Sequence, residues 1–420
     1  MTQATLPLAN VRIVDFTMGW AGPLATRHLA DMGADVIKVE GGTRPDWWRG
    51  FETTPESMAR GDHERNPPFN HINRNKRGVA IDLVRPEGRA LALDLVAQAD
   101  AVIENQATGV MRKLGLSYDD LKDANPAIIM VSLPGFGTEG PWSAYRGYGS
   151  TFEQASGLPH LSGGPDDPPV QTHIAYGDAC GGLFSAAALL TALYHKRRTG
   201  EGQRVDLSQV ETNMQLGVHG MIHQGLHGTP PPRMGSRHPV YVPQGCFPVT
   251  GTDRWIVVSV TDDEVWPRLA QAIGRPDLAE APDLATVAGR RAREDELEAA
   301  IADWTRTRSQ EEAMQTLQAA GVAAGRVARP LQLLDDPILE SSGFWQVVDR
   351  AYVGPKPHPA MPYRMNGERG AIRHPAPLLG EHTEQVLRDV LGLDRTEIEG
   401  LLASGVIARP PAVPEEEAAT

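Results

Sequence analysis

Short apolar runs alternate with stretches of helical period along the first half of the chain. Strands that alternate with helices of this length pair in parallel through right-handed crossovers. The pattern therefore predicts an α/β protein with a Rossmann-like large domain, in which ligands bind beyond the carboxyl ends of the strands. Strands are predicted over residues 11–16, 34–40, 79–83, 101–105 and 127–137, and helices over residues 22–33 and 86–100.

The alternation stops near residue 225. Residues 227–239 are rich in Gly and Pro, and two β-branched runs over 246–260 predict a hairpin. Helical patterns follow at 262–274 and 293–307. We therefore predict a large domain over 1–224, a small α+β domain over 225–335, a segment over 336–410 that returns to the large domain, and a disordered tail over 411–420.

Charge and composition narrow the classes of partner. The 420 residues carry a formal net charge of −13. Nucleic acids and anionic membranes bind proteins with clustered positive charge, so neither is expected as a partner. Neither the two cysteines nor the thirteen histidines show a metal-ligand spacing, so no metal is expected. The first residues lack a secretory pattern and no run of 18 apolar residues occurs, which predicts a cytoplasmic protein without a membrane span.

The stretch AYGDACGGLFSAAALL, residues 175–190, places one carboxylate among small and apolar residues. Asp178 lies at the predicted start of a long helix. One interpretation is a helix N-cap, for which Asp is a favoured residue. The other is a nucleophile, because Gly177, Gly181 and Gly182 cost helix stability and leave room for a ligand. The residues alone leave both interpretations open.

Two groups of cations stand out in this acidic chain. NRNKRG, residues 73–78, contains Arg74 and Lys76, and a second pair is formed by Arg112 and Lys113. Each group is either a solvated loop or part of a phosphate-binding surface.

Five longer motifs follow one another along most of the chain. They are VRIVDFTMGWAGPLATRHLADMGADVIKVE (11–40), NRNKRGVAIDLVRPEGRALALDLVAQADAVIEN (73–105), GFGTEGP (135–141), GDACGGLFSAAALLTALYHKRRTGEGQRVDLS (177–208) and LLGEHTEQVL (378–387). In this order and spacing they resemble the class III CoA-transferases, the family of formyl-CoA transferase and carnitine CoA-transferase. The resemblance implies CoA as a co-substrate, an acyl-CoA donor and a carboxylic acid acceptor.

The resemblance also implies roles for individual residues. Asp178 matches the family nucleophile, which forms an aspartyl anhydride and then an enzyme–CoA thioester. Asn105 matches an Asn near CoA, and Lys113 stands where formyl-CoA transferase has an Arg for a CoA phosphate. Tyr148 matches a Tyr near the active site. Trp20 replaces a Gln beside the active Asp, so we expect a bulky or apolar (di)carboxylic acid rather than oxalate.

Two alternatives remain at this point. The first is an acyl-CoA racemase or isomerase on the same fold, although the related racemases carry a His where Tyr148 stands. The second is a non-catalytic partner subunit of a CoA-transferase complex. Family members form interlocked dimers, so the resemblance implies an interlocked homodimer, with a hetero-oligomer as the other possibility.

Overall fold

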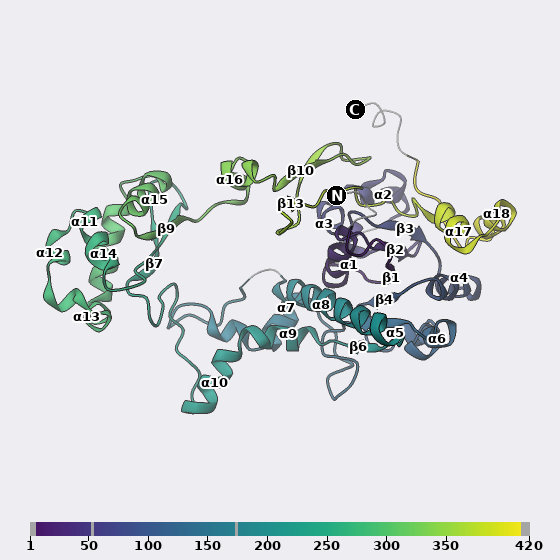
Figure 1. Ribbon diagram of the computed structural model, residues 1–420, viewed down its shortest axis with the longest axis horizontal. Helices are drawn as coiled ribbons and strands as arrows, with labels where there is room; N and C mark the ends of the chain where they lie inside the picture. The colour runs from purple at the N-terminus through teal and green to yellow at the C-terminus, as the bar shows by residue number, and fades with distance from the viewer. Residues whose placement is uncertain (1–5, 52–53, 173–174, 413–420) are drawn as a thin grey trace. The chain divides into compact units, whose positions relative to one another are not determined.

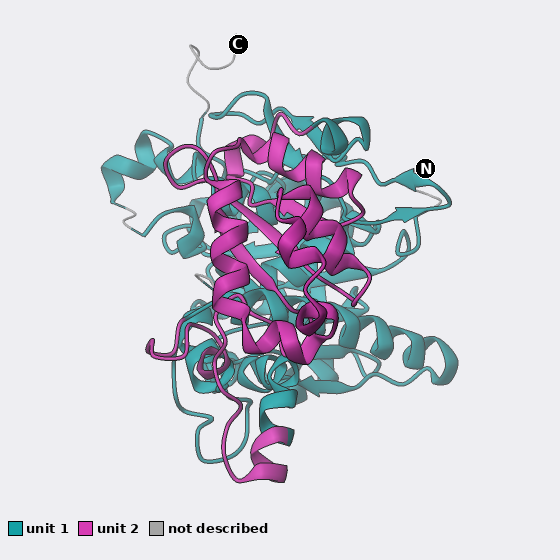
Figure 2. Ribbon diagram, turned by 90° about the vertical axis from the view of Figure 1, so that its left-hand side faces the viewer, with its two compact units in different colours: residues 1–158, 171–222, 337–420 teal, residues 159–170, 223–336 magenta. Residues whose placement is uncertain are grey.

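The structure is a computed structural model that describes residues 6–51, 54–172 and 175–412. The chain divides into two compact units, which Figure 2 shows in separate colours. Residues 413–420 of the predicted tail lie outside the described residues. Unit 1 comprises residues 1–158, 171–222 and 337–420, and unit 2 comprises residues 159–170 and 223–336.

A six-stranded parallel sheet organises unit 1 (Figure 1). The strand order is β3-β2-β1-β4-β5-β6, with every neighbouring pair parallel. The order reverses between β1 and β4, and ligands bind beyond the carboxyl ends of strands at such a reversal. The predicted α/β class with a Rossmann-like sheet is therefore confirmed. The strands are β1 (Arg12–Asp15), β2 (Asp35–Glu40), β3 (Arg77–Ala80), β4 (Ala101–Glu104), β5 (Ile129–Ser132) and β6 (Arg204–Asp206).

Helices cover both faces of this sheet. Val14 and Ile37 pack in one buried cluster with apolar residues of α4 (Pro86–Ala97), α17 (Thr383–Leu391) and α18 (Arg395–Ala403). Ile13 and Val36 pack in another with apolar residues of α1 (Ala21–Asp31) and α8 (Tyr176–Thr199). Successive side chains of a strand point to opposite faces, so neighbouring residues enter different clusters. Burial on both faces explains why the central strands β4 and β5 appear as continuous apolar runs in the sequence.

The remaining elements of unit 1 connect and flank these layers. Two short antiparallel hairpins, β10 (Trp345–Val348) with β11 (Lys356–Pro359) and β12 (Arg364–Met365) with β13 (Glu368–Arg369), precede the last helices. The helices are α1 (Ala21–Asp31), η2 (Trp47–Arg49), α2 (Pro55–Ala59), η3 (Asp62–Glu64), α3 (Pro67–Ile72), α4 (Pro86–Ala97), α5 (Val110–Lys113), α6 (Tyr118–Ala124), α7 (Gly149–Ala155), α8 (Tyr176–Thr199), α9 (Gln209–Leu216), α16 (Pro337–Ser341), α17 (Thr383–Leu391) and α18 (Arg395–Ala403).

The C-terminal part of unit 1 pairs with the end of β3. Asp82 N donates to Val406 O at 2.8 Å, and Ala408 N donates to Ala80 O at 3.2 Å. Residues far apart in the sequence therefore meet beside the carboxyl ends of β2 and β3.

A buried ion-pair network fixes the segment that follows β2. Arg49 Nε lies 2.8 Å from Glu40 Oε1, and its Nη1 lies 2.7 Å from Glu64 Oε2. Arg350 also contacts Glu64 Oε2, at 2.5 Å. Burial alone would raise the pKa of Glu64, but Arg49 and the other partners lower it to about 2. Charges buried this deeply require such complete pairing.

Unit 2 is a small α+β unit. Its antiparallel sheet has the order β7-β8-β9, from strands β7 (Gln244–Pro248), β8 (Trp255–Ser259) and β9 (Ala323–Arg326). Apolar residues of the sheet and of the surrounding helices form one buried cluster, which includes the fully buried Trp266. Its helices are α11 (Val265–Ala272), α12 (Pro276–Ala279), η5 (Pro282–Ala285), α13 (Val287–Ala292), α14 (Glu294–Thr305), α15 (Gln310–Ala319) and η6 (Pro330–Leu333). Two further elements, η4 (Leu158–Leu161) and α10 (Val218–His227), cross the boundary between the units in the sequence.

Helix α8 is the one helix of the described part of the chain that is long and apolar enough to cross a membrane. Half of its most apolar window is nevertheless buried inside the protein. Leu189 and Leu193 on α8 pack with Leu29 of α1 in the core. Packing in the core of unit 1 therefore accounts for the apolar residues of α8.

Candidate active site

Asp178 lies inside the first turn of α8. The helix begins at Tyr176, which makes Asp178 its third residue, and the N-cap is Ala175 without a side-chain capping bond. The interpretation of Asp178 as the N-cap is therefore wrong. A carboxylate in the first helical turn is still stabilised by the helix dipole.

The Asp178 carboxylate accepts hydrogen bonds from the backbone N–H groups of Ala21 and Gly149. Ala21 is the first residue of α1, and Gly149 is the first residue of α7. Burial raises the pKa of Asp178 to about 6, although these two hydrogen bonds oppose the rise. The group is therefore a desolvated carboxylate that is ionised at neutral pH and held by fixed donors.

Glycines let the helix ends come this close. A Cβ on Gly177 would lie 2.6 Å from Gly149 O, and one on Gly182 would lie 2.6 Å from Ala21 O. A Cβ on Gly149 would lie 1.9 Å from Asp178 Oδ2. These distances are shorter than van der Waals contact, so a side chain does not fit at these positions. Gly177 and Gly182 let the backbones of neighbouring helices approach each other, and Gly149 leaves room for the Asp178 carboxylate.

Asn105 holds the loop that leads from β1 to α1. Its Oδ1 accepts from Met18 N at 2.8 Å, and its Nδ2 donates to Met18 O at 2.8 Å. The side chain thus satisfies both backbone groups of one loop residue. In the structure Asn105 fixes the approach to Ala21.

Five aromatic residues form a group that we call the aromatic cluster. It consists of Trp20, Trp47, Trp48, Phe51 and Tyr148. The ring centroids of Trp20 and Trp48 are 5.6 Å apart, as are those of Trp47 and Tyr148. Tyr148 is 68% exposed and Phe51 is 83% exposed. Trp20 and Tyr148 directly precede Ala21 and Gly149 in the sequence, so the cluster adjoins both donors of Asp178.

A cavity of about 690 Å³ opens at the carboxyl ends of the first strands of unit 1. Its walls come from the ends of β1 to β4, from the turn of residues 41–44, from α5 and from residues 405–408. Arg44 is the only cation among its lining residues, all of which are described. Met18 and Gln106 connect this cavity to the loop that Asn105 holds. Its volume and position suit a sizeable ligand.

The predicted phosphate-binding cations occupy different places. Arg112 lines a second cavity of about 230 Å³, whereas Lys113, at the end of α5, is exposed. Arg74 is buried and pairs with Asp31 at 2.7 Å. Lys76 is also buried, in contact with Asp15 and with two other acceptors.

Because their charged groups are buried and paired with Asp31 and Asp15, Arg74 and Lys76 do not present a phosphate-binding surface in this structure. Both help to hold the core of unit 1 instead.

Comparison with known proteins identifies the family of this chain. Residues 8–383 match the sequence model of CoA-transferase family III. The chain belongs to CoA-transferase family III. It is therefore a CoA-transferase, an enzyme with CoA as co-substrate.

Relatives of this CoA-transferase match it over nearly their whole length. Succinyl-CoA–D-citramalate CoA-transferase of Chloroflexus aurantiacus is 33% identical over 405 residues, covering 96% of this chain and 98% of that protein. Succinate–glutarate CoA-transferase of Agrobacterium fabrum is 31% identical over 390 residues, covering 93% and 97%. The crystal structure of a CAIB/BAIF family protein from Brucella suis matches with a TM-score of 0.81 and 29% identity, covering 92% and 99%.

Several residues of this candidate site could not be predicted from the sequence. The donors Ala21 and Gly149 carry no functional side chain, so only the structure reveals them. Arg44 was missed because a single arginine in a Gly-rich turn has no pattern. Trp47 and Trp48 could have been noticed as adjacent tryptophans in an otherwise aromatic-poor chain.

Proposed function

We propose that this CoA-transferase moves CoA from an acyl-CoA to a carboxylic acid by covalent catalysis at Asp178. The observation that supports the proposal most directly is a half-buried, desolvated carboxylate held by two backbone N–H groups at the start of α8. Such a group is desolvated and fixed. No described residue forms an ion pair with Asp178 that would reduce its nucleophilicity.

The first half of the reaction removes the donor acid. An oxygen of Asp178 attacks the thioester carbonyl, the C–S bond breaks, and CoA leaves as a thiolate. The thiolate then attacks the aspartyl carbonyl of the mixed anhydride, and the donor carboxylate leaves. Asp178 now carries CoA as a thioester. Splitting one exchange into two acyl transfers lowers the barrier of each.

The second half reverses these steps with the acceptor. The acceptor carboxylate attacks the aspartyl thioester and expels the thiolate, which then attacks the acceptor's carbonyl carbon and regenerates the Asp178 carboxylate. Whenever the aspartyl carbonyl is attacked, negative charge develops on its own oxygen. The N–H groups of Ala21 and Gly149 are directed at the oxygens of this carboxyl group and would stabilise that charge.

We propose that CoA itself binds in the cavity of about 690 Å³, with Arg44 as the ligand of a phosphate. Three carboxylates also line this cavity. Glu40 and Asp46 are each paired with a buried cation, whereas no described cation pairs with Asp82. Arg44 has no ion-pair partner among the described residues, and it supplies the positive charge that a phosphate of CoA requires.

Replacing Arg44 with alanine is expected to raise the KM for acyl-CoA by about 10- to 100-fold, the value of one charge-assisted hydrogen bond. The kcat at saturating acyl-CoA should change little, because Arg44 does not contact Asp178. Arg395→Ala on α18, 90% exposed at its side chain, is the matched control and should leave KM unchanged. Equal KM values for wild type and Arg44→Ala would place the CoA phosphates elsewhere.

For the acceptor we propose a carboxylic acid with a bulky, apolar substituent, in the first place a substituted dicarboxylic acid. Relatives are named for glutarate and D-citramalate, which are dicarboxylic acids. The aromatic cluster adds uncharged ring surface beside both donors of Asp178. Rings at this position favour an acceptor that can bury apolar area.

A series of acceptors tests this preference with succinyl-CoA as the donor. Phenylsuccinate is expected to exceed glutarate, which has no ring, in kcat/KM by about 10-fold or more, because burying an aromatic group contributes about 1.5–3 kcal/mol. Trp20→Gln should reduce this preference, whereas Trp142→Leu, outside the aromatic cluster, should preserve it. Turnover of oxalate or formyl-CoA far above that of every bulky substrate would contradict the proposal.

The cytoplasmic location and the interlocked dimer stay predictions of the sequence. Gel filtration with light scattering would test the dimer, and activity that appears only after addition of a second subunit would indicate a hetero-oligomer.

A further inference from the structure

The loop of residues 16–20 leads directly to Ala21, whose N–H group faces Asp178. The position of this donor depends on how the loop is held. Asn105 binds one of its residues, Met18, through both backbone groups. Asn105 does not bind Gly19 or Trp20, the last two residues before Ala21. These two residues determine the direction in which α1 begins.

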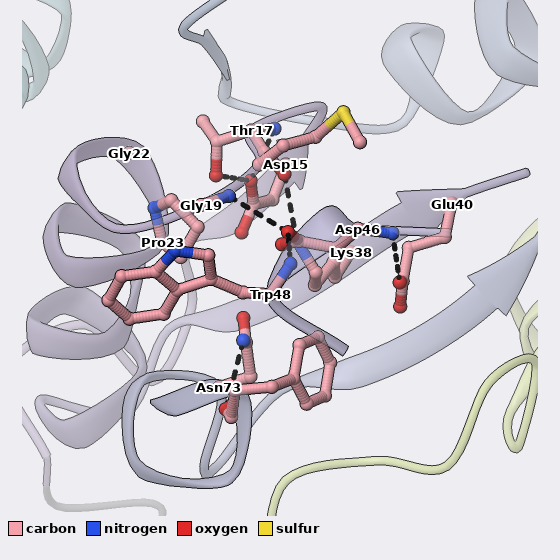
Figure 3. Close-up of polar contacts among 12 residues, drawn as sticks. Asp15, Thr17, Gly19, Gly22, Pro23, Lys38, Glu40, Asp46, Trp48 and Asn73 are labelled. Carbon is pink, nitrogen blue, oxygen red and sulfur yellow. Dashed lines mark hydrogen bonds and ion pairs between the residues drawn. The ribbon is translucent and has the colours of Figure 1, made fainter. Parts of the chain in front are cut away.

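Asp46 anchors the next residue of the loop (Figure 3). Its Oδ1 accepts from Gly19 N at 2.9 Å and from Trp48 N at 3.0 Å. Its Oδ2 lies 2.9 Å from Lys38 Nζ, which also donates to Thr17 O at 2.8 Å. One carboxylate thus joins the β1–α1 loop, the strand β2 and the aromatic cluster.

The side chains of Asp46 and Lys38 are completely buried. Burial lowers the pKa of Lys38, but Asp46 and the neighbouring carboxylates outweigh it and raise the pKa above its ordinary value. Lys38 is therefore a fixed cation that holds Asp46 in one orientation. The ring of Trp48, two residues after Asp46, has its centroid 5.6 Å from that of the Trp20 ring. The end of the loop is therefore held at the backbone of Gly19 and at the side chain of Trp20.

We propose that Asp46, oriented by Lys38, is a positioning residue for CoA transfer: it fixes Gly19 and Trp48 so that the Ala21 N–H meets the Asp178 carboxylate. This inference rests on the proposed role of Asp178. Asp46 itself bonds the loop and not the reacting carboxylate. Loss of its acceptor oxygen should therefore act on the reaction through the donor at Ala21.

The pH dependence of kcat/KM reports this effect. Asp178 reacts as a carboxylate, so activity should fall below about pH 6 as it is protonated. The hydrogen bond from Ala21 lowers the pKa of Asp178, so its loss must raise that pKa. The acidic limb of the profile, where kcat/KM falls at low pH, then moves to higher pH. Burial and the two backbone bonds cause the present pKa. The titratable groups on the helices packed against α8 are Arg27, His28 and Asp31 on α1, Glu153 on α7 and Glu211 on α9. Burial and the nearby Arg27 lower the pKa of His28 to about 4, so this imidazole is neutral where Asp178 titrates.

Two double variants separate positioning from the stability of the ion pair. Lys38→Met/Asp46→Asn and Lys38→Met/Asp46→Ala both remove the two buried charges, but only the asparagine keeps an oxygen for Gly19 and Trp48. Both are assayed below their unfolding midpoints, with circular dichroism to verify folding. We expect the alanine variant to have a kcat about 10- to 100-fold below that of the asparagine variant and an acidic limb at higher pH. The kcat values are compared at saturating acyl-CoA, because Asp46 also lines the cavity proposed for CoA.

The outcomes distinguish this inference from the proposed function. Equal kcat values and equal acidic limbs in the two double variants would overturn the positioning role while leaving Asp178 as the nucleophile. A wild-type enzyme without an acidic limb, together with an active Asp178→Asn variant, would instead overturn the proposed function. A kcat loss in the alanine variant without a shifted limb would show that Asp46 does not act through Ala21.

Discussion

Replacing Asp178 with asparagine is expected to lower kcat for CoA transfer by more than about 10⁴-fold, as removal of an enzyme nucleophile does. Asparagine has nearly the same shape, and its side-chain oxygen can still accept from Ala21 and Gly149. It cannot form an anhydride with an acyl group. The measurement is the rate of acyl-CoA exchange with a saturating acid, at a pH above 7 where wild-type Asp178 is ionised.

The same variant should be more stable than wild type at neutral pH. The pKa of Asp178 is raised in the folded protein, from 3.8 to about 6, so its ionisation costs stability once the pH exceeds its unfolded value. A shift of this size corresponds to about 3 kcal/mol at pH 7. The advantage of asparagine should shrink as the pH falls from about 6 and disappear below about 4. Lost activity combined with a higher unfolding midpoint would exclude misfolding as the cause.

Chemical trapping provides the control for the nucleophile. Wild-type enzyme quenched with hydroxylamine in the presence of acyl-CoA should carry a hydroxamate in the peptide that contains Asp178. Asp277→Asn, a change at an exposed carboxylate of unit 2, should be modified and active like wild type. A modified residue other than Asp178, or an unchanged rate in Asp178→Asn, would contradict the mechanism.

The sequence predicted the strands that carry apolar or β-branched runs, including the half-buried β7 and β8, and missed strands such as β6 and β9 that lack one. Strands β4 and β5 carry continuous apolar runs because helices cover both of their faces. Strand β6, Arg204–Asp206, lies at the edge of the sheet, where its residues are exposed or half-buried, and it carries no such run. Strand β9, Ala323–Arg326, has no β-branched residue.

The site was predictable where chemistry is visible in one side chain, and less so where it depends on tertiary contacts. Asp178 stood out because no cation surrounds it in the sequence. Arg74 and Lys76 suggested a phosphate site, but their carboxylate partners, Asp31 and Asp15, lie 43 and 61 residues away in the chain. Such partners cannot be read from local charge patterns. The same applies to backbone donors, which every residue except proline possesses.

Replacing Gly149 with alanine is expected to lower kcat by about 10²–10³-fold, the usual cost of losing an oxyanion donor. The new Cβ would lie 1.9 Å from Asp178 Oδ2 and 2.7 Å from its Cγ. The carboxylate must rotate away from this contact and thereby leave the N–H groups of residues 21 and 149. The KM for acyl-CoA should change little, because residue 149 does not line the cavity proposed for CoA.

Gly400→Ala provides the matched control for this steric argument. Gly400 lies on α18, and a Cβ there would meet no atom within 4 Å. This change should leave kcat unaltered and stabilise the helix by up to about 1 kcal/mol. Wild-type kcat in Gly149→Ala would show that the carboxylate reacts from a different orientation, in which the donors at the starts of α1 and α7 take no part. A selective loss of kcat in that variant alone would instead show that transfer depends on a carboxylate held where only glycine leaves room for it.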